Sequence, residues 1–270
     1  MKILYVGDIV GRPGRNAVKV LVPQLRHAYN VDLVFANGEN LAAGLGMTYD
    51  KYREMVGAGI DYFTSGNHIW SKQEFVPYLD DPEVCVLRPA NYATNEPGRG
   101  FGIIEKDGVR VQLVNLLGRA FMKGEISDYF DVMDNILTNT EADIRIVDFH
   151  AEATSEKIIL ATYLDGKVSA LVGTHTHVPT ADERILPHGT AFQTDLGMVG
   201  PLHSSLGATI QPRIDAMRTG SRALYKVAKS PVTVFNATLL EIDSATGTAK
   251  RIERIQRYLD VATGKVSESL

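Results

Sequence analysis

Five short polar motifs, each placed at the end of an apolar run, carry side chains that can bind metal ions. Their carboxylate, amide and imidazole groups belong to Asp8, Glu39, Asn67, His150, His175 and His177. The pair His175 and His177 is the most specific of these motifs, because alternate residues of an extended chain share one face. Ligands of α/β proteins gather at the carboxyl ends of the strands. We therefore expect these six side chains to converge on one site.

The types of these ligands restrict both the metal and the reaction. Imidazole, carboxylate and amide groups without a thiolate favour iron, manganese or zinc, and three histidines disfavour an all-oxygen calcium or magnesium cage. Two divalent ions would outweigh the charges of Asp8 and Glu39 even with a hydroxide between them. Such a positive site suits a phosphodiester monoanion, and a metal pair can activate water and stabilise the charge that develops. The residues thus predict a dinuclear hydrolase of phosphoesters.

The elements that must position these groups alternate between short β-type runs and amphipathic stretches, which is the pattern of an α/β protein. Runs rich in Val, Ile and Leu predict strands at residues 2–6, 32–36, 62–65, 84–87, 145–148 and 169–172. Helical periodicity predicts helices at residues 15–29, 49–56, 73–79, 129–137 and 155–164.

Two predicted hairpins interrupt this alternation. Residues 101–106 and 109–113 flank Asp107-Gly108, a dipeptide that suits a tight type I′ turn. Residues 232–242 and 250–258 flank a second turn at 245–247. Antiparallel additions of this kind argue against a plain doubly wound sheet or a (β/α)8 barrel. We predict two packed mixed sheets with helices outside, in one domain over residues 1–270.

Composition limits the setting and the partners of the protein. The net charge is −4 and no long basic run is present, so we expect no binding to duplex nucleic acid. One cysteine, Cys85, excludes an intrachain disulfide. No apolar stretch is long enough for a membrane helix, and no signal peptide precedes residues 2–6, so we expect a cytoplasmic protein without a membrane partner. Composition leaves both a monomer and a homo-oligomer open.

The ordered motifs resemble those of the calcineurin-like metallophosphoesterases. The resemblance rests on Gly7-Asp8, Gly38-Glu39-Asn40, Gly66-Asn67-His68, His150 and Gly173-Thr174-His175-Thr176-His177. Two departures are informative: Asp8-Ile9-Val10 lacks the usual histidine, and Glu39 replaces the usual bridging aspartate. These departures resemble the YmdB-like branch, as does the later run Thr194-Asp195-Leu196-Gly197-Met198.

This resemblance implies a four-layer α/β/β/α sandwich with two metal ions, iron first and manganese second. It also implies phosphodiesterase activity on small phosphodiesters, notably 2′,3′-cyclic nucleotides. One ion would take Asp8, Glu39, Asn40 and His177, and the other Glu39, Asn67, His150 and His175, with Glu39 bridging. His68 would be the proton donor to the leaving group, since an imidazole titrates near neutral pH.

Three other interpretations stay open at the level of the sequence. A metal-dependent phosphomonoesterase would use the same ligands. An amidohydrolase also uses two metals and a His-x-His pair, although it normally places that pair on an early strand of a barrel. A noncatalytic regulatory or RNA-interacting module could keep the metal site for sensing a ligand.

Overall fold

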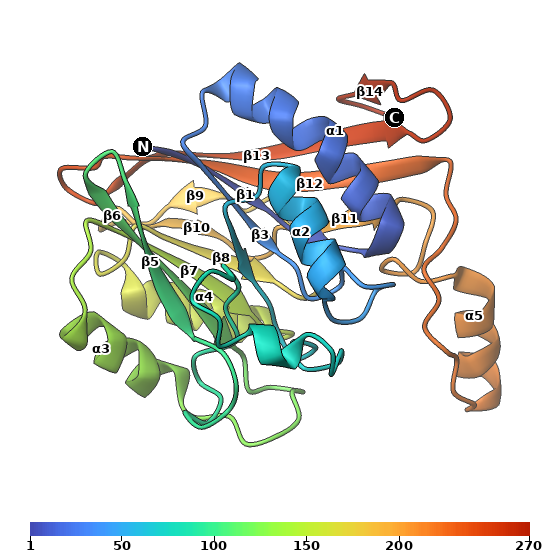
Figure 1. The fold of residues 1–270 in the computed structure, drawn as a ribbon, viewed down its shortest axis with the longest axis horizontal. Helices are drawn as coiled ribbons and strands as arrows, with labels where there is room; N and C mark the ends of the chain where they lie inside the picture. Colours follow the sequence, from blue (N-terminus) through green and yellow to red (C-terminus); the bar gives the residue numbers. More distant parts are fainter.

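Two β-sheets form the centre of the molecule in the computed structural model, which describes residues 1–270 (Figure 1). The eight-stranded sheet has the order β14-β13-β12-β1-β3-β4, with β2 and β11 beside it. Its strands are β1 (Lys2–Val6), β2 (Asp8–Ile9), β3 (Leu33–Asn37), β4 (Tyr62–Thr64), β11 (Met198–Pro201), β12 (Val232–Ile242), β13 (Ala249–Asp260) and β14 (Val266–Ser267).

The six-stranded sheet has the order β5-β6-β7-β8-β10-β9. Its strands are β5 (Phe101–Lys106), β6 (Val109–Leu117), β7 (Ile144–His150), β8 (Ala170–Thr174), β9 (Arg184–Ile185) and β10 (Ala191–Gln193). The pairs from β6 to β10 are parallel, whereas β5 and β9 add at the two edges in antiparallel fashion. Parallel β1, β3 and β4 likewise meet antiparallel β12. Both sheets are therefore mixed, as predicted.

Three apolar clusters stack these elements into four layers. The cluster between the sheets joins side chains such as Tyr5 and Phe35 to Leu113 and Ile146. A second cluster packs α1 (Gly11–Tyr29) and α2 (Tyr49–Gly57) on the outer face of the first sheet. A third packs α3 (Tyr129–Asn139) and α4 (Thr154–Leu164) on the outer face of the second sheet. The α/β/β/α order is confirmed. In contrast, α5 (Ile210–Thr219) has no buried residue and lies apart from both sheets (Figure 1).

Two predicted elements are wrong. Residues 84–87 form no strand, because Val86 and Leu87 pair with their neighbours only through isolated bridges. Residues 73–79 contain only the short 3-10 helix Val76–Tyr78, since Pro77 has no N–H with which to extend an α-helix. In addition, α1 begins four residues before the predicted start, because a first-turn proline such as Pro13 removes only an N–H that is unpaired there.

Both predicted hairpins are confirmed. Asp107 and Gly108 have φ angles of 52° and 77°, the left-handed values that a type I′ turn requires at both central residues. The second hairpin, β12–β13, joins two strands of 11 and 12 residues at the edge of the first sheet. These hairpins widen the sheets without adding helices, which explains why the strict β–α alternation is broken.

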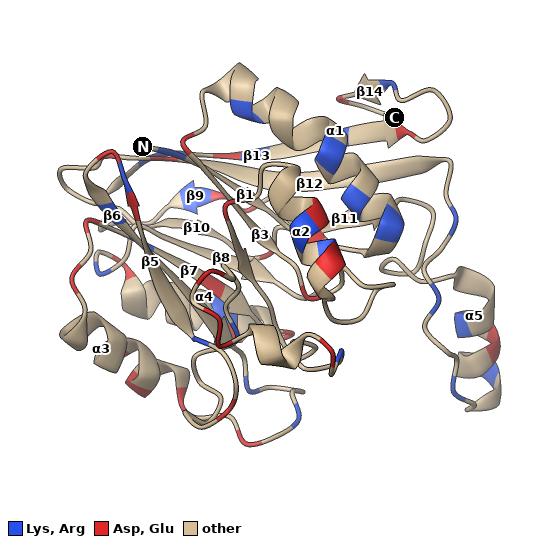
Figure 2. Cartoon of the chain, in the orientation of Figure 1, with Lys and Arg blue, Asp and Glu red and all other residues tan.

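Charged side chains of α1 and α2 pair with one another. Figure 2 shows basic residues along α1, next to α2 with its acidic residues. Arg15 and Lys19 of α1 each lie 2.8 Å from Glu54 of α2. No helix is both long enough and apolar enough to cross a lipid bilayer.

Candidate metal centre

The candidate ligands meet where the carboxyl ends of strands from both sheets come together. Asp8 lies in β2, Glu39 and Asn40 follow β3, and Asn67 and His68 follow β4. His150 is the last residue of β7, and His175 and His177 follow β8. The structure therefore brings together the residues that the motifs predicted, and no single sheet could have done so alone.

Glu39, His150 and His175 form the tightest part of this group. Their ligand atoms all lie within 4.8 Å of one another. The Nε2 atom of His150 is 3.0 Å from Glu39 Oε1 and 3.0 Å from His175 Nδ1. His150 and Glu39 are buried, whereas His175 is partly exposed. Gly66 permits this packing, because a Cβ at that position would lie 2.3 Å from His150 Nε2 and 2.4 Å from Glu39 Oε2.

A second group gathers around His177. Its Nε2 atom lies 3.2 Å from Asn40 Oδ1 and 3.9 Å from Asp8 Oδ1. Asp8 Oδ1 and Asn67 Oδ1 are both buried without a hydrogen-bond partner. Buried oxygens without a donor are costly, and a divalent cation would satisfy them. The residues therefore fit a metal centre with two neighbouring donor groups, and their roles as ligands stay a prediction.

Charges within the cluster shift several pKa values in opposite directions. Burial raises the pKa of Asp8 to about 7, although His177 and His150 partly offset the effect. Burial also disfavours ionisation of Glu39, but the charge and hydrogen bond of His150, together with His68, outweigh burial and lower the pKa of Glu39 to about 2. Conversely, burial disfavours the charged form of His150, but Glu39, together with Asp8 and Asp148, outweighs burial and raises the pKa of His150 to about 9. Burial, followed by the charge of His150, lowers the pKa of His175 to about 3. Without metal, His150 is thus the cation that Glu39 faces.

A buried carboxylate fixes the orientation of His150. The Thr174 hydroxyl lies 2.7 Å from Asp148 Oδ1, to which it donates, and 2.9 Å from His150 Nδ1. Since a hydroxyl has one hydrogen, His150 Nδ1 must be the donor to Thr174, which leaves Nε2 free to bind a metal. The other oxygen of Asp148 accepts from Asn37 and Tyr5. No motif indicated Asp148, because the predicted strand ended there; the observed strand continues to His150 and places both side chains on one face.

The loop that carries His175 and His177 is held by a buried ion pair. Both histidines have positive φ angles, 97° and 66°, which side chains with a Cβ rarely adopt. Lys157 Nζ lies 2.7 Å from Asp195 Oδ2 and donates to Thr174 O at 2.8 Å. Asp195 Oδ2 in turn accepts from Thr176 N–H at 3.2 Å. Nothing in the sequence indicated this role of Lys157, because a lysine in an amphipathic helix is ordinarily exposed.

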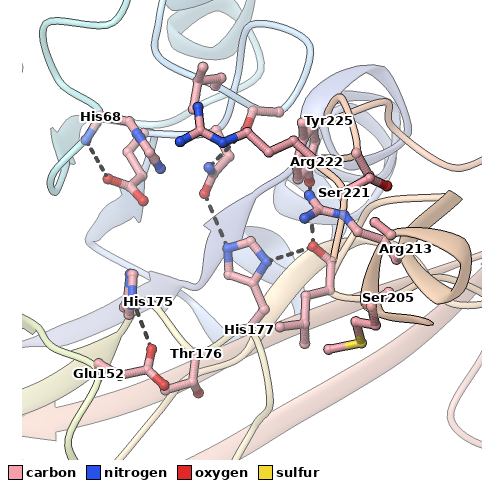
Figure 3. Close-up of a pocket in the computed structure, with 18 residues that line it drawn as sticks. His68, Glu152, His175, Thr176, His177, Ser205, Arg213, Ser221, Arg222 and Tyr225 are labelled. Carbon is pink, nitrogen blue, oxygen red and sulfur yellow. Dashed lines mark hydrogen bonds and ion pairs between the residues drawn. The ribbon is translucent and has the colours of Figure 1, made fainter. Parts of the chain in front are cut away.

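An open cavity of about 680 Å³ lies over this cluster (Figure 3). Glu39, Asn40, His68, His175 and His177 line one end of it. His68 donates its backbone N–H to Glu39 Oε2 at 3.1 Å, and its side chain lies at the pocket surface. The candidate proton donor therefore faces the space in which a substrate can bind, above ligands that are buried.

Comparisons with known proteins agree with this architecture. The YmdB-like protein family matches residues 4–255. The 2′,3′-cyclic-nucleotide 2′-phosphodiesterase of Bacillus subtilis (strain 168) is 42% identical over 257 residues, which cover 94% of this chain and 96% of that protein. A crystal structure described as a novel phosphatase from Mycoplasma pneumoniae has a TM-score of 0.91 and 34% identity, covering 96% of this chain and 93% of that one.

More distant similarity extends to the wider fold. The calcineurin-like phosphoesterase YfkN of Bacillus subtilis has a TM-score of 0.55 at 13% identity and covers 100% of this chain and 93% of its own. At that identity the likeness shows the fold alone. The chain belongs to the YmdB-like family, hydrolases with the calcineurin-like metallophosphoesterase fold, and that fold implies divalent metal ions.

Proposed function

We propose that this protein is a dinuclear-metal phosphodiesterase of small phosphodiesters, with 2′,3′-cyclic nucleotides as its substrates. The observation that supports this proposal best is the joint presence of two donor groups, one of Glu39, His150 and His175 and one around His177. The orphaned oxygens Asp8 Oδ1 and Asn67 Oδ1 support it further. The Bacillus subtilis relative is named for the same substrate class.

In the proposed site, Asp8, Glu39, Asn40 and His177 hold one ion, and Glu39, Asn67, His150 and His175 hold the other. Bound there, two divalent ions supply charge stabilisation and lower the pKa of water. In the overall hydrolysis, a water oxygen would join phosphorus as one ester bond between phosphorus and the ribose breaks, and the proton that the water loses would pass to the solvent. His68 gives its imidazole proton to the departing ribose oxygen, which leaves a nucleoside monophosphate. Asp148 and Glu152 keep the imidazoles of His150 and His175 oriented.

Metal analysis coupled to a substrate panel tests the proposal. Purified protein is stripped with a chelator, reloaded separately with iron, manganese or zinc, and analysed for bound metal. Each form is then assayed with adenosine 2′,3′-cyclic phosphate, bis-p-nitrophenyl phosphate and p-nitrophenyl phosphate. We expect two ions per chain and metal-dependent turnover of the diesters, with iron or manganese the most active.

Three outcomes would contradict the proposal in different ways. One ion per chain at saturation refutes the dinuclear site. Faster turnover of the monoester than of either diester makes the protein a phosphomonoesterase. Binding of a cyclic nucleotide without any hydrolysis by the metal-loaded protein makes it a noncatalytic ligand-binding module.

A further inference from the structure

The cavity over the candidate centre extends well beyond the proposed ligands. Its far wall consists of α5 and the segment that follows, residues 221–225. Arg213 and Met217 reach the cavity from α5, and Arg222 and Tyr225 from the segment. Helix α5 adds no buried side chain to the apolar core, but it forms part of this cavity wall. Lys and Arg residues lie on α5 and along the segment that follows it (Figure 2).

The far wall carries two arginines, Arg213 and Arg222. The acidic residues of the cavity are Glu39 and Glu152, and both lie at the end with the candidate ligands. Arg213 and Arg222 take part in no ion pair; the guanidinium of Arg213 lies 5.5 Å from the ring of Tyr225. In Figure 3 the side chain of Arg222 extends over the pocket, toward the side that carries His68. A guanidinium presents a planar set of donors that matches a phosphate group.

Short contacts connect this wall to the candidate centre. The carbonyl oxygen of Leu206 accepts the Tyr225 hydroxyl at 3.4 Å and lies 3.0 Å from His177 Nδ1. Tyr225 in turn packs beside Arg213. One chain of neighbours therefore links the proposed metal ligand His177 to Arg213. Because His177, Arg213 and Arg222 line the same cavity, a single extended substrate can contact all three.

We propose that Arg213 and Arg222 form a subsite for a second phosphate of the substrate. This inference rests on the proposed phosphodiesterase function and specifies its substrate class. A nucleoside 2′,3′-cyclic phosphate has a single phosphate, which binds at the candidate metal centre. Such a substrate has no second anionic group for the two arginines to bind. A substrate with a further phosphate on its 5′ side, such as the cyclic-phosphate end of an oligonucleotide, occupies both ends of the cavity. Tyr225 and Leu206 offer the flat and apolar surface on which a base can stack.

The test compares substrates that differ only in charge at the second position. The three substrates are adenosine 2′,3′-cyclic phosphate with a free 5′ hydroxyl, its 5′-phosphorylated form, and an adenosine dinucleotide that ends in the cyclic phosphate. A dinucleotide with a neutral methylphosphonate linkage is the uncharged match of the third. We expect kcat/KM to be about 10- to 100-fold higher for the charged dinucleotide than for the neutral one, the range of a charge-assisted hydrogen bond. The 5′-phosphorylated nucleotide shows whether a terminal phosphate is recognised as well as an internucleotide one.

Variants of the arginines locate the effect. Arg213→Gln and Arg222→Gln should each reduce the ratio between charged and neutral dinucleotides, and Arg213→Lys should reduce it less. Arg218→Gln is the matched control, because Arg218 belongs to α5 but does not line the cavity. It should keep the wild-type ratio. Higher salt should lower the ratio in the wild type, since the two guanidinium groups are accessible to ions.

Two results would overturn the subsite. The first is a ratio of kcat/KM, charged to neutral dinucleotide, that is near one in the wild type. The second is a double variant, Arg213→Gln/Arg222→Gln, in which this ratio is as high as in the wild type. The ratio of dissociation constants for the two dinucleotides, measured by calorimetry on metal-loaded protein, tests the subsite without turnover. Absence of hydrolysis of every substrate therefore refutes the phosphodiesterase function alone, and the binding ratio still decides the subsite.

Discussion

The ion pair between Lys157 and Asp195 provides the sharpest test of how the histidine loop is held. Both residues are buried, and their charged atoms lie 2.7 Å apart. Asp195→Asn preserves the shape of the side chain but leaves the ammonium of Lys157 buried without a counter-charge. Removing one partner of a buried pair costs roughly 3–5 kcal/mol. At about 2–4 °C per kcal/mol for a chain of comparable size, the thermal midpoint should fall by roughly 6–20 °C.

The assay is urea and thermal unfolding of the chelator-treated protein, so that weaker metal binding does not add to the effect. Asp243→Asn is the matched control, because Asp243 pairs with Lys250 at 2.8 Å on the surface. That variant should unfold at the wild-type midpoint. The double change Lys157→Met/Asp195→Leu should recover only part of the lost stability. It removes the unpaired charge, but it leaves the backbone N–H groups of Thr176 and Gly197 without the carboxylate that accepts from them. A loss in Asp195→Asn below about 1 kcal/mol, the range of surface pairs, would refute the reasoning.

The remaining predictions concern the candidate centre itself. His68→Ala should lower turnover of a cyclic nucleotide by roughly 10²- to 10⁴-fold while metal content is unchanged; His188→Ala is the control, and wild-type turnover would remove the role of His68. Glu39→Gln should deplete both ions in metal analysis, whereas exposed Glu125→Gln should not; retention of two ions would disprove the bridge. In metal-free protein, the pKa of His150 is raised from 6.5 to about 9, so its pairing stabilises the fold fully below 6.5 and is lost as pH rises through 9. The pKa of Glu39 is lowered from 4.5 to about 2, so its contribution is present above 4.5 and lost toward 2. Urea midpoints should therefore fall between about pH 6 and pH 9, and a rise would contradict this assignment.

The sequence predicted the parts of the site that lie at the ends of strands. Apolar runs marked β1, β3, β4, β7 and β8, and polar residues stood directly at their ends. Strand β7 departs from this pattern, because it was expected to end at Asp148 but continues to His150. A carboxylate usually terminates a buried strand. Here Asn37, Tyr5 and Thr174 surround it with donors, so the strand passes through a polar core.

The features that escaped prediction depend on partners distant in the sequence. Lys157 and Asp195 are 38 residues apart, and the type of each alone indicates a surface residue. No helix was predicted at α5, because its sequence has only weak helical periodicity of apolar residues. This helix lines the cavity and does not pack on the core. Local patterns report which face of an element is apolar. They do not report which charges meet inside the fold or which helix covers a site from outside.

The packing around Val10 accounts for the missing histidine in the first motif. Val10 is fully buried in a small apolar cluster with Met198 and Val234. A histidine at this position would be surrounded by apolar side chains and would lose stability through unpaired ring nitrogens. Asn40 instead directs its amide oxygen to within 3.2 Å of His177 Nε2, from the loop after β3. We therefore propose that the amide oxygen of Asn40, from the second motif, supplies the donor that the first motif lacks at the candidate centre.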